Sequence, residues 1–148
     1  MSKIEYKVSR ISSIKFFHEQ IEQRELDKLF KAKEKGLAIN LNIGSKTELS
    51  TSTMTIDITT KLSRQSDNQV LVEHTGRTAF EVKGLKNIYD KEKERINFPD
   101  GLLIQIYSIA YTHARALLAV ELSPTVYKDK YFLPVVDPSV FLNMIKTA

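Results

Sequence analysis

The stretch LLIQIYSIAYTHARALLAVE, residues 102–121, decides the fold, because it is the longest apolar segment of the chain and contains neither Gly nor Pro. On a helical wheel its apolar side chains cover an arc of about 220°, whereas a surface helix with one core contact needs roughly 100°. We therefore expect a long helix with two covered faces. One face would lie on the chain's own sheet. The second would lie on another copy of the chain, since 148 residues leave little else to cover it.

A membrane span is the main alternative for such a segment. Gln105, His113 and Arg115 interrupt it, whereas a transmembrane helix needs about 20 nearly uninterrupted apolar residues. The first ten residues, MSKIEYKVSR, contain no apolar core of a signal peptide. We therefore predict a cytoplasmic protein that does not insert into a membrane.

The composition indicates one globular domain over residues 1–148. The net charge of +4, from 22 Lys and Arg against 18 Asp and Glu, is weak support for an anionic partner. The absence of Cys excludes disulfides, thiolate nucleophiles and Cys-based metal sites.

The first two thirds of the chain alternate apolar and polar residues, as half-buried strands do. We expect strands in IEYKV with its continuation to Phe16, in LAINLNI, in TMTIDITTKL and in VLVEHTGRTAFEV. The first loses its phase across SRISS, which predicts a β-bulge. Because short polar turns separate the last three, the order favours an antiparallel meander with one apolar and one polar face.

Helices are predicted between and after these strands. Leu26, Leu29 and Phe30 have helical spacing, and Gly36 suits the end of that short helix. KNIYDKEKERIN reads as a charged connector, Pro99 opens the long helix, and Pro138 opens a short C-terminal helix. The predicted fold class is α+β: a four-stranded antiparallel sheet, then a long helix and a short C-terminal helix.

A search for catalytic chemistry finds no positive signal. His18, His74 and His113 lie far apart in the sequence and form no metal-ligand spacing. His74 and His113 fall on apolar faces, where a histidine is more often a satisfied core group than a ligand. No phosphate-binding loop or nucleophile elbow is present. The outward sheet positions carry Thr, Asn and Asp rather than aromatics interleaved with Lys or Arg, so nucleic acid is not the expected partner. No enzyme activity, cofactor or metal is predicted.

The C-terminal part of the chain contains an aromatic-x-x-Ala-Arg element, a Pro-punctuated crossover and a short apolar helix: Tyr111, Ala114, Arg115, Leu133, Pro134, Val135, Asp137, Pro138, Phe141 and Leu142. In these residues the chain resembles the SecB family of export chaperones. YKVSRI and LAINLNI are similar to the first two strands of the family. The resemblance implies an ATP-independent holdase, a homotetramer built as a dimer of dimers, and long helices between the dimers.

This resemblance assigns expected roles to individual residues. The oligomer interface would include Ile104, Tyr107, Tyr111, Arg115 and Leu118. For Arg115 two interpretations stay open: its stem covers apolar surface, or it forms an ion pair across the tetramer with Glu121 or Asp100 of a partner. A holdase needs apolar surface that stays open. We expect that surface at Leu37, Ile39, Leu41, Tyr127, Tyr131, Phe132, Phe141, Leu142 and Ile145. An alternative stays open for the last helix with Phe141, which could instead cap the core of the sheet.

Two departures weaken the export part of the expectation. Family members that serve export are acidic and use acidic sheet residues to bind the translocation motor SecA, whereas this chain is basic. Glu73 matches one such position, but Ser13 and Phe17 occupy the positions expected on the first strand. The acidic C-terminal tail is also absent. Three hypotheses therefore stand: a holdase for unfolded polypeptides, with export by a SecA-type motor as one pathway; an interaction module dedicated to one partner, such as an antitoxin; and an enzyme.

Overall fold

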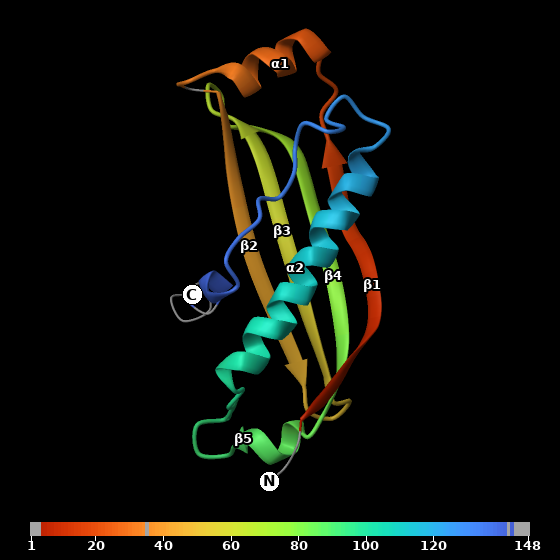
Figure 1. Ribbon diagram of the computed structural model, residues 1–148, viewed down its shortest axis with the longest axis vertical. Helices are drawn as coiled ribbons and strands as arrows, with labels where there is room; N and C mark the ends of the chain where they lie inside the picture. Colours follow the sequence, from red (N-terminus) through yellow and green to blue (C-terminus); the bar gives the residue numbers. More distant parts are fainter. Residues whose placement is uncertain (1–3, 35, 142, 144–148) are drawn as a thin grey trace.

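The computed structural model describes residues 4–34, 36–141 and 143 (Figure 1). Its main element is an antiparallel sheet of four long strands in the order β1-β4-β3-β2. The strands are β1 (Glu5–His18), β2 (Leu37–Glu48), β3 (Thr53–Arg64) and β4 (Gln69–Lys83). The predicted meander of β2, β3 and β4 is thus confirmed, and β1 joins it beside β4.

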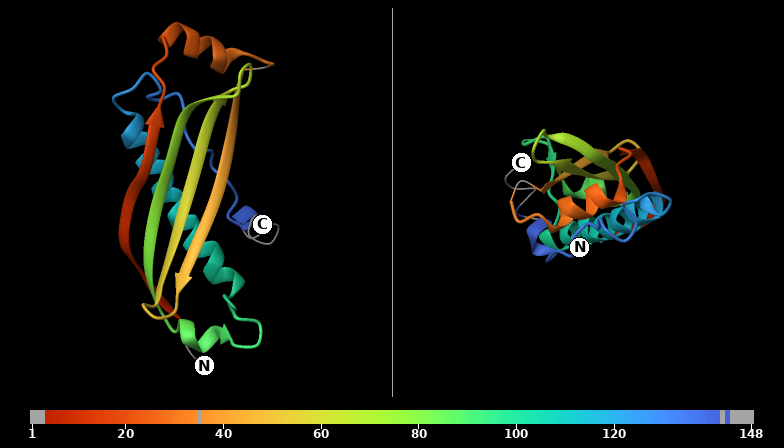
Figure 2. Two further views of the ribbon diagram at one scale, coloured as in Figure 1. Left: turned by 180° about the vertical axis from the view of Figure 1, so that it is seen from behind. Right: turned by 90° about the horizontal axis from the view of Figure 1, so that it is seen from above.

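One face of the sheet carries the core, as the alternation predicted. Every second residue of β3 is buried there, including Met54, Ile56, Ile58 and Leu62. The same face of β4 buries Val72, His74, Phe80 and Val82. The opposite face is polar and is turned toward the viewer in Figure 2, with the long helix behind it. Such one-sided burial is usual for an antiparallel sheet.

The first strand contains two irregularities where one bulge was predicted. Its register with β4 shifts between Val8 and Arg10 and again between Ser13 and Lys15. Each shift inserts one extra residue and returns the apolar side chains to the core face. The bulges explain why Ile11, between them, is out of phase with Tyr6 and Val8, and why Phe16 after the second bulge is in phase with them again.

The long helix α2 (Asp100–Leu122) crosses the core face diagonally (Figure 1). It buries one arc of side chains against the sheet: Ile106, Tyr107, Ala110, Tyr111, Ala114, Leu118 and Leu122. The helix lies close to β4 at Gly76, where an added Cβ atom would lie 3.1 Å from both the Cα and Cβ atoms of Ala114. The small size of Gly76 and Ala114 therefore allows α2 to lie this close to the sheet.

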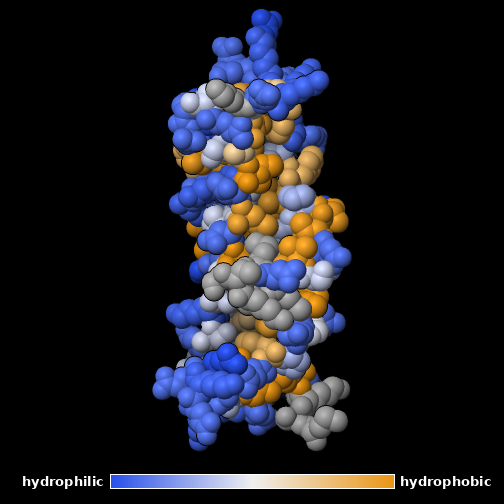
Figure 3. All heavy atoms as spheres, turned by 90° about the vertical axis from the view of Figure 1, so that its left-hand side faces the viewer, coloured by the Kyte–Doolittle hydropathy of each residue, from blue (hydrophilic) through white to orange (hydrophobic). Residues whose placement is uncertain are grey.

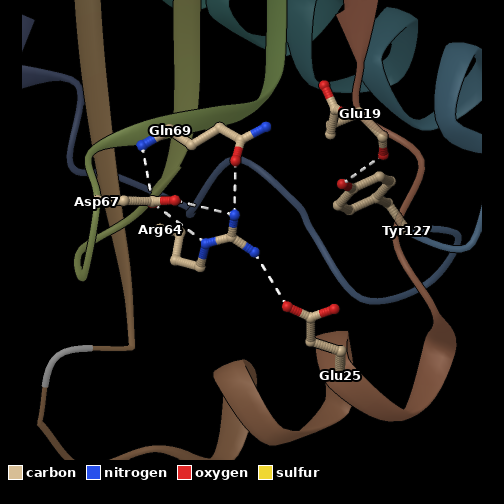
Figure 4. Close-up of polar contacts among 6 residues, drawn as sticks. All are labelled: Glu19, Glu25, Arg64, Asp67, Gln69 and Tyr127. Atoms are coloured by element: carbon tan, nitrogen blue, oxygen red, sulfur yellow. Dashed lines mark hydrogen bonds and ion pairs between the residues drawn. The ribbon is translucent and has the colours of Figure 1, made fainter.

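The short helix α1 (Gln23–Lys31) lies across one end of the sheet. Leu26 anchors it in the core with no exposed surface. Arg64 at the end of β3 holds it by a 3.0 Å ion pair with Glu25 while also binding Asp67 and Gln69 (Figure 4). The guanidinium of Arg64 lowers the pKa of the Asp67 carboxyl chiefly by donating hydrogen bonds to it. An ion pair between Lys130 and Asp27 ties the later loop to the same helix.

The end of α1 differs from the prediction. The helix stops at Lys31, five residues before Gly36. Gly36 instead lies where the chain enters β2, and a Cβ atom there would come within 2.7 Å of the carbonyl oxygen of Leu29. Its role is close packing of backbone against backbone rather than helix termination.

The charged connector contains structure that the sequence did not reveal. A 3₁₀ turn η1 (Leu85–Ile88) leads into a two-stranded hairpin, β5 (Tyr89–Asp90) and β6 (Arg95–Ile96). The Asp90 carboxylate stabilises the turn between β5 and β6 by accepting hydrogen bonds from the backbone N–H groups of Glu92 and Lys93. Strands of two residues are too short to show a periodic pattern.

The chain ends its described part with an extended segment and a helical turn over residues 139–141. The fold is therefore the predicted α+β arrangement of a four-stranded antiparallel sheet, a long helix and a short C-terminal helix. Across the described residues no helix is both long and apolar enough to cross a membrane.

The contact between Gly76 and Ala114 makes a prediction about stability. Gly76→Val should lower the free energy of unfolding by about 2 kcal/mol, since the added methyl groups force α2 away from the sheet. Gly44→Val is the matched control, because a Cβ atom at Gly44 meets nothing within 4 Å. Urea unfolding followed by circular dichroism measures both variants. Equal effects at the two glycines would contradict the packing argument.

Candidate functional site: an apolar strip beside an edge strand

The second strand, β2, is an edge of the sheet and pairs only with β3. Leu37, Ile39, Leu41 and Ile43 lie directly opposite residues of β3 such as Leu62 and Ile58, so they share the core face of the sheet. Their row lies at the margin of the core, and Ile39 is 52% exposed. An apolar row is thus left open along this edge.

The C-terminal segment, residues 131–141, passes over the same face of the sheet (Figure 1). From residue 131 to residue 137 it is extended and belongs to no strand. Tyr131 and Leu133 point into the core, and the Tyr131 hydroxyl hydrogen-bonds with Thr60, the residue opposite Leu41. Phe132, which alternates with them, is 52% exposed.

Two side chains of α2 hold this segment by consecutive backbone carbonyls. The Tyr111 hydroxyl donates a 2.6 Å hydrogen bond to the carbonyl of Pro134, and Arg115 Nε donates one of 3.1 Å to the carbonyl of Leu133. Burial raises the pKa of Tyr111, so the hydroxyl keeps the proton that it donates. We call these two contacts the carbonyl clamp. Because Tyr111 and Arg115 are four residues apart on one helix face, they meet neighbouring peptide units of an extended chain.

The exposed and half-buried apolar residues of both elements form one surface, which we call the apolar strip. Ile39, Phe132, Val135 and Val140 are exposed, and Leu37, Leu41 and Ile43 are half-buried beside them. Figure 3 faces this edge of the molecule and shows hydrophobic side chains in a column between hydrophilic ones. The strip holds no acid, base or nucleophile in an activated arrangement. It offers non-directional apolar contact, whose strength follows the area removed from water.

The two edges of the sheet differ in how well they are protected against pairing. β1 has two bulges and the charged residues Glu5, Lys7, Arg10 and Lys15. β2 pairs with β3 without any register shift, and its first nine residues, LAINLNIGS, carry no charge. Bulges and charges are the usual devices that keep an edge strand from pairing with another chain. The β2 edge lacks them beside the apolar strip.

The structure corrects part of the predicted client-binding set. Tyr127, Tyr131 and Phe141 are buried, with at most 2% exposure, so they are core residues and not open contacts. Leu37 and Leu41 are half-buried, while Ile39 and Phe132 are exposed as expected. Leu142 and Ile145 lie outside the described residues.

The predicted oligomer interface is corrected in a similar way. Tyr107, Tyr111 and Leu118 are buried in the chain's own core, so they offer no surface to a second subunit. The apolar arc of the helix is wide because one flank meets the sheet and another meets the C-terminal segment of the same chain. Ile104 and Arg115 are half-buried on that second flank. Arg115 uses its Nε–H inside the subunit, and an additional ion pair across a tetramer stays a prediction.

Glu73, the expected motor-binding residue, lies on the polar face of β4. Its carboxylate forms a 2.8 Å ion pair with Lys15 of β1, and only 16% of its side chain is exposed. Asp57 on the same face is likewise paired with Arg77 at 2.8 Å. Both of these acids are therefore paired with cations of the same chain.

The three histidines do not form a site. His74 is fully buried, and its Nε2 atom lies 2.9 Å from the Ser13 hydroxyl. His113 Nδ1 lies 3.0 Å from the Thr78 hydroxyl. Within the described part of the chain, no group of three or more His, Cys, Asp or Glu residues is arranged to hold a metal ion.

A cavity of about 380 Å³ lies at the α1 end, lined by residues 18–22 and 124–126. The neighbouring Tyr127 hydroxyl donates to the carbonyl of Glu19 at 2.9 Å, and burial raises the pKa of Tyr127 to about 12 (Figure 4). The buried phenol stays neutral and serves as a structural tie.

Sequence reasoning missed several members of the site. Ile43 was placed on the correct face but not assigned to the strip, and Val135 and Val140 were assigned only to the crossover and the last helix. The alternation of LAINLNI contained the signal for Ile43. The carbonyl clamp had no signal in the spacing alone, because its acceptors are backbone atoms that any sequence supplies.

No family model matches the chain, and no curated protein matches it in sequence. Among solved structures, the chain is similar to the SecB-like chaperone Rv1957 of Mycobacterium tuberculosis, determined in complex with a ChAD peptide from the antitoxin HigA1. The TM-score is 0.50 at 11% identity, and the match covers 89% of this chain and 88% of the other. At this identity the likeness concerns the fold.

Buried His74 makes a prediction about acid stability. Burial lowers its pKa from 6.5 to about 4, so the unfolded chain binds a proton more readily than the folded chain between these values. Stability should therefore fall as the pH drops from about 6.5 toward 4, by about 3 kcal/mol at the limit. His74→Gln should remove this part of the slope.

Urea unfolding of the variant and of the wild-type chain at a series of pH values measures the effect. An unchanged slope in His74→Gln would show that another group titrates.

Proposed function

We propose that this protein is a non-catalytic, ATP-independent chaperone that holds non-native polypeptide segments on the apolar strip. The observation that carries the proposal is the open row of β2 side chains beside exposed Phe132 and Val135, the latter 81% exposed. Unfolded chains share few features except apolar side chains and a free backbone. A surface made of apolar contacts suits such clients, because it requires no fixed sequence.

The backbone of β2 supports the same function. An extended client segment can add to the edge as a fifth strand, with hydrogen bonds that do not depend on its side chains. Its alternate side chains would then continue the row of Leu37, Ile39 and Leu41 under the C-terminal segment. Backbone pairing contributes affinity, and the apolar strip selects segments with alternating apolar residues.

The likeness in fold to a SecB-like chaperone agrees with this proposal, and two pathways are compatible with it. One is general protein export, in the cytoplasm and with a SecA-type motor. The other is service to one dedicated partner, such as an antitoxin. The pairing of Glu73 with Lys15 favours the second, because a basic motor segment would find its acidic contact already occupied. Suppression of aggregation of several unrelated clients would instead indicate the first.

Assembly into a homotetramer belongs to the same proposal. Exposed aliphatic side chains that the strip does not use lie along β1 and on the outer side of α2: Val8, Ile11, Ile14 and Val120. They suit contact with further copies of the chain, at a surface other than the buried arc of α2. Sedimentation at micromolar concentration checks this assignment, and a monomer would contradict it.

The proposal predicts which substitutions weaken client binding. Ile39→Ser and Phe132→Ser should each lower the affinity for a permanently unfolded probe, reduced and carboxymethylated α-lactalbumin, by about tenfold. Both side chains are half-exposed already, so the folded chain should keep its melting temperature to within a few degrees. Fluorescence anisotropy of the labelled probe measures the affinity.

Val126→Ser and Phe30→Ser form the matched control pair. They remove one aliphatic and one aromatic side chain of 37% and 39% exposure outside the strip. Affinity should stay at the wild-type value in both. If the control pair weakens binding as much as the strip pair does, clients bind to exposed apolar residues in general and the strip is not the site.

A further inference from the structure

Phe141 occupies an unusual position at the end of the C-terminal segment. Its ring is 2% exposed and packs on Tyr111 of α2, with ring centroids 5.3 Å apart. The residues that lead to it are exposed, apart from half-buried Val136: Pro134, Val135, Asp137, Pro138, Ser139 and Val140. One aromatic side chain therefore anchors a stretch that otherwise lies at the surface.

The turn that carries Phe141 satisfies its own hydrogen bonds. The Asp137 carboxylate accepts from the backbone N–H and the hydroxyl of Ser139, both at 2.9 Å. The backbone N–H of Val140 donates to the Asp137 carbonyl, and that of Phe141 donates to the Pro138 carbonyl. None of these bonds reaches the sheet or α2. If the turn moves away as a unit, the apolar contacts that it loses are those of buried Phe141 and of half-buried Val136.

The contacts that fix the C-terminal segment differ before and after Pro134. Up to that residue the chain is fixed by the carbonyl clamp and by the buried side chains of Tyr131 and Leu133. Beyond it, Phe141 is the one fully buried side chain among the described residues. Pro134 is therefore the last fixed point, and residues 135–141 form a tether that ends in an aromatic ring.

We propose that Phe141 is a tethered competitor of the client: it fills the apolar pocket beside Tyr111 and withdraws when a client side chain takes its place. This inference rests on the proposed function, since it concerns regulation of the same apolar strip. A folded chain with Phe141 seated keeps the pocket covered in the absence of clients. Clients that bring an aromatic or large aliphatic side chain displace it.

The expected strength of this competition follows from the burial of one aromatic side chain. Such burial favours the seated state by a factor on the order of 10 to 100. The open fraction is then about 1–10%, and the apparent affinity for a client is lower by the same factor than that of an open pocket. Removal of the Phe141 ring should therefore raise the apparent affinity for a client to that of the open pocket.

The first experiment compares Phe141→Ala with the wild-type chain for binding of labelled, reduced and carboxymethylated α-lactalbumin. The variant should bind the probe at least about tenfold more tightly. Ser139→Ala is the matched control, because its side chain lies on the same turn, is exposed and is no part of the apolar strip, so this variant should bind as the wild type does. Equal or weaker binding by Phe141→Ala would overturn the inference, since the ring would then be ordinary core or part of the binding surface.

A second measurement does not depend on the stability of one variant. A synthetic peptide of residues 133–143, LPVVDPSVFLN, is added in trans to Phe141→Ala. It should displace the probe, whereas the same peptide with Ala in place of Phe should not. Failure of both peptides to compete would overturn the inference. If the wild type binds the probe and Phe141→Ala binds it no better, the inference alone fails; if no form binds the probe, the proposed function fails as well.

Discussion

The close approach of α2 to β4 is the constraint on which the rest of the molecule depends. At Gly76 the sheet has no side chain, and Ala114 on the helix contributes a single methyl group, so the two layers touch nearly backbone to backbone. This contact fixes the height and rotation of the helix over the sheet. Tyr111 and Arg115 follow from it, because they lie within one turn of Ala114 and are turned toward the C-terminal segment. A helix held farther from the sheet would move both donors away from the carbonyls of residues 133 and 134.

The same geometry explains why the helix covers one part of the sheet and leaves another open. A straight helix that crosses a twisted sheet diagonally covers the central strands and leaves opposite corners exposed. Val8 and Ile11 on β1 lie at one such margin, and Ile39 on β2 lies at the other. The chain covers the β2 margin only with its extended C-terminal segment. The apolar strip is thus a consequence of packing one helix on four strands.

Sequence reasoning succeeded where a signal repeats and failed where it depends on tertiary contact. Apolar residues at every second position identified β2 and β3 as strands and showed which of their faces meets the core. The signal is strong because the alternation continues over many residues. The hairpin at Tyr89–Asp90 and Arg95–Ile96 was missed because two residues cannot show a period. The wide arc of α2 predicted a second covering surface, and residues 131–141 of the same chain contact the helix at Tyr111 and Arg115. The sequence could not show this contact, because nothing local to residues 102–121 distinguishes a neighbouring subunit from residues 131–141. Cover by another copy of the chain stays a prediction.

The candidate site illustrates the same limit. Ile39 and Phe132 were predicted as open contacts and are exposed. Tyr131 and Phe141 were grouped with them because a Pro-punctuated segment rich in aromatics resembles a mobile loop, yet their side chains lie in the core. The burial of Tyr131 and Phe141 depends on the carbonyl clamp and on Thr60, whose residues are distant from them in the sequence. Alternation along the segment, with Tyr131 inward and Phe132 outward, becomes informative only when the sheet beneath it is known.

An uncharged edge strand beside an apolar row is a hazard as well as a binding surface, because it can template the addition of further chains. Three features of the fold limit that hazard. Lys46 and Glu48 place charges at one end of β2, α1 lies across the other end, and the C-terminal segment passes over the apolar row between them. The length of edge that remains accepts a guest about the size of one strand. A protein that must remain soluble while offering apolar surface needs this combination: an edge regular enough to pair with a client, and ends and a cover that keep it from pairing without limit.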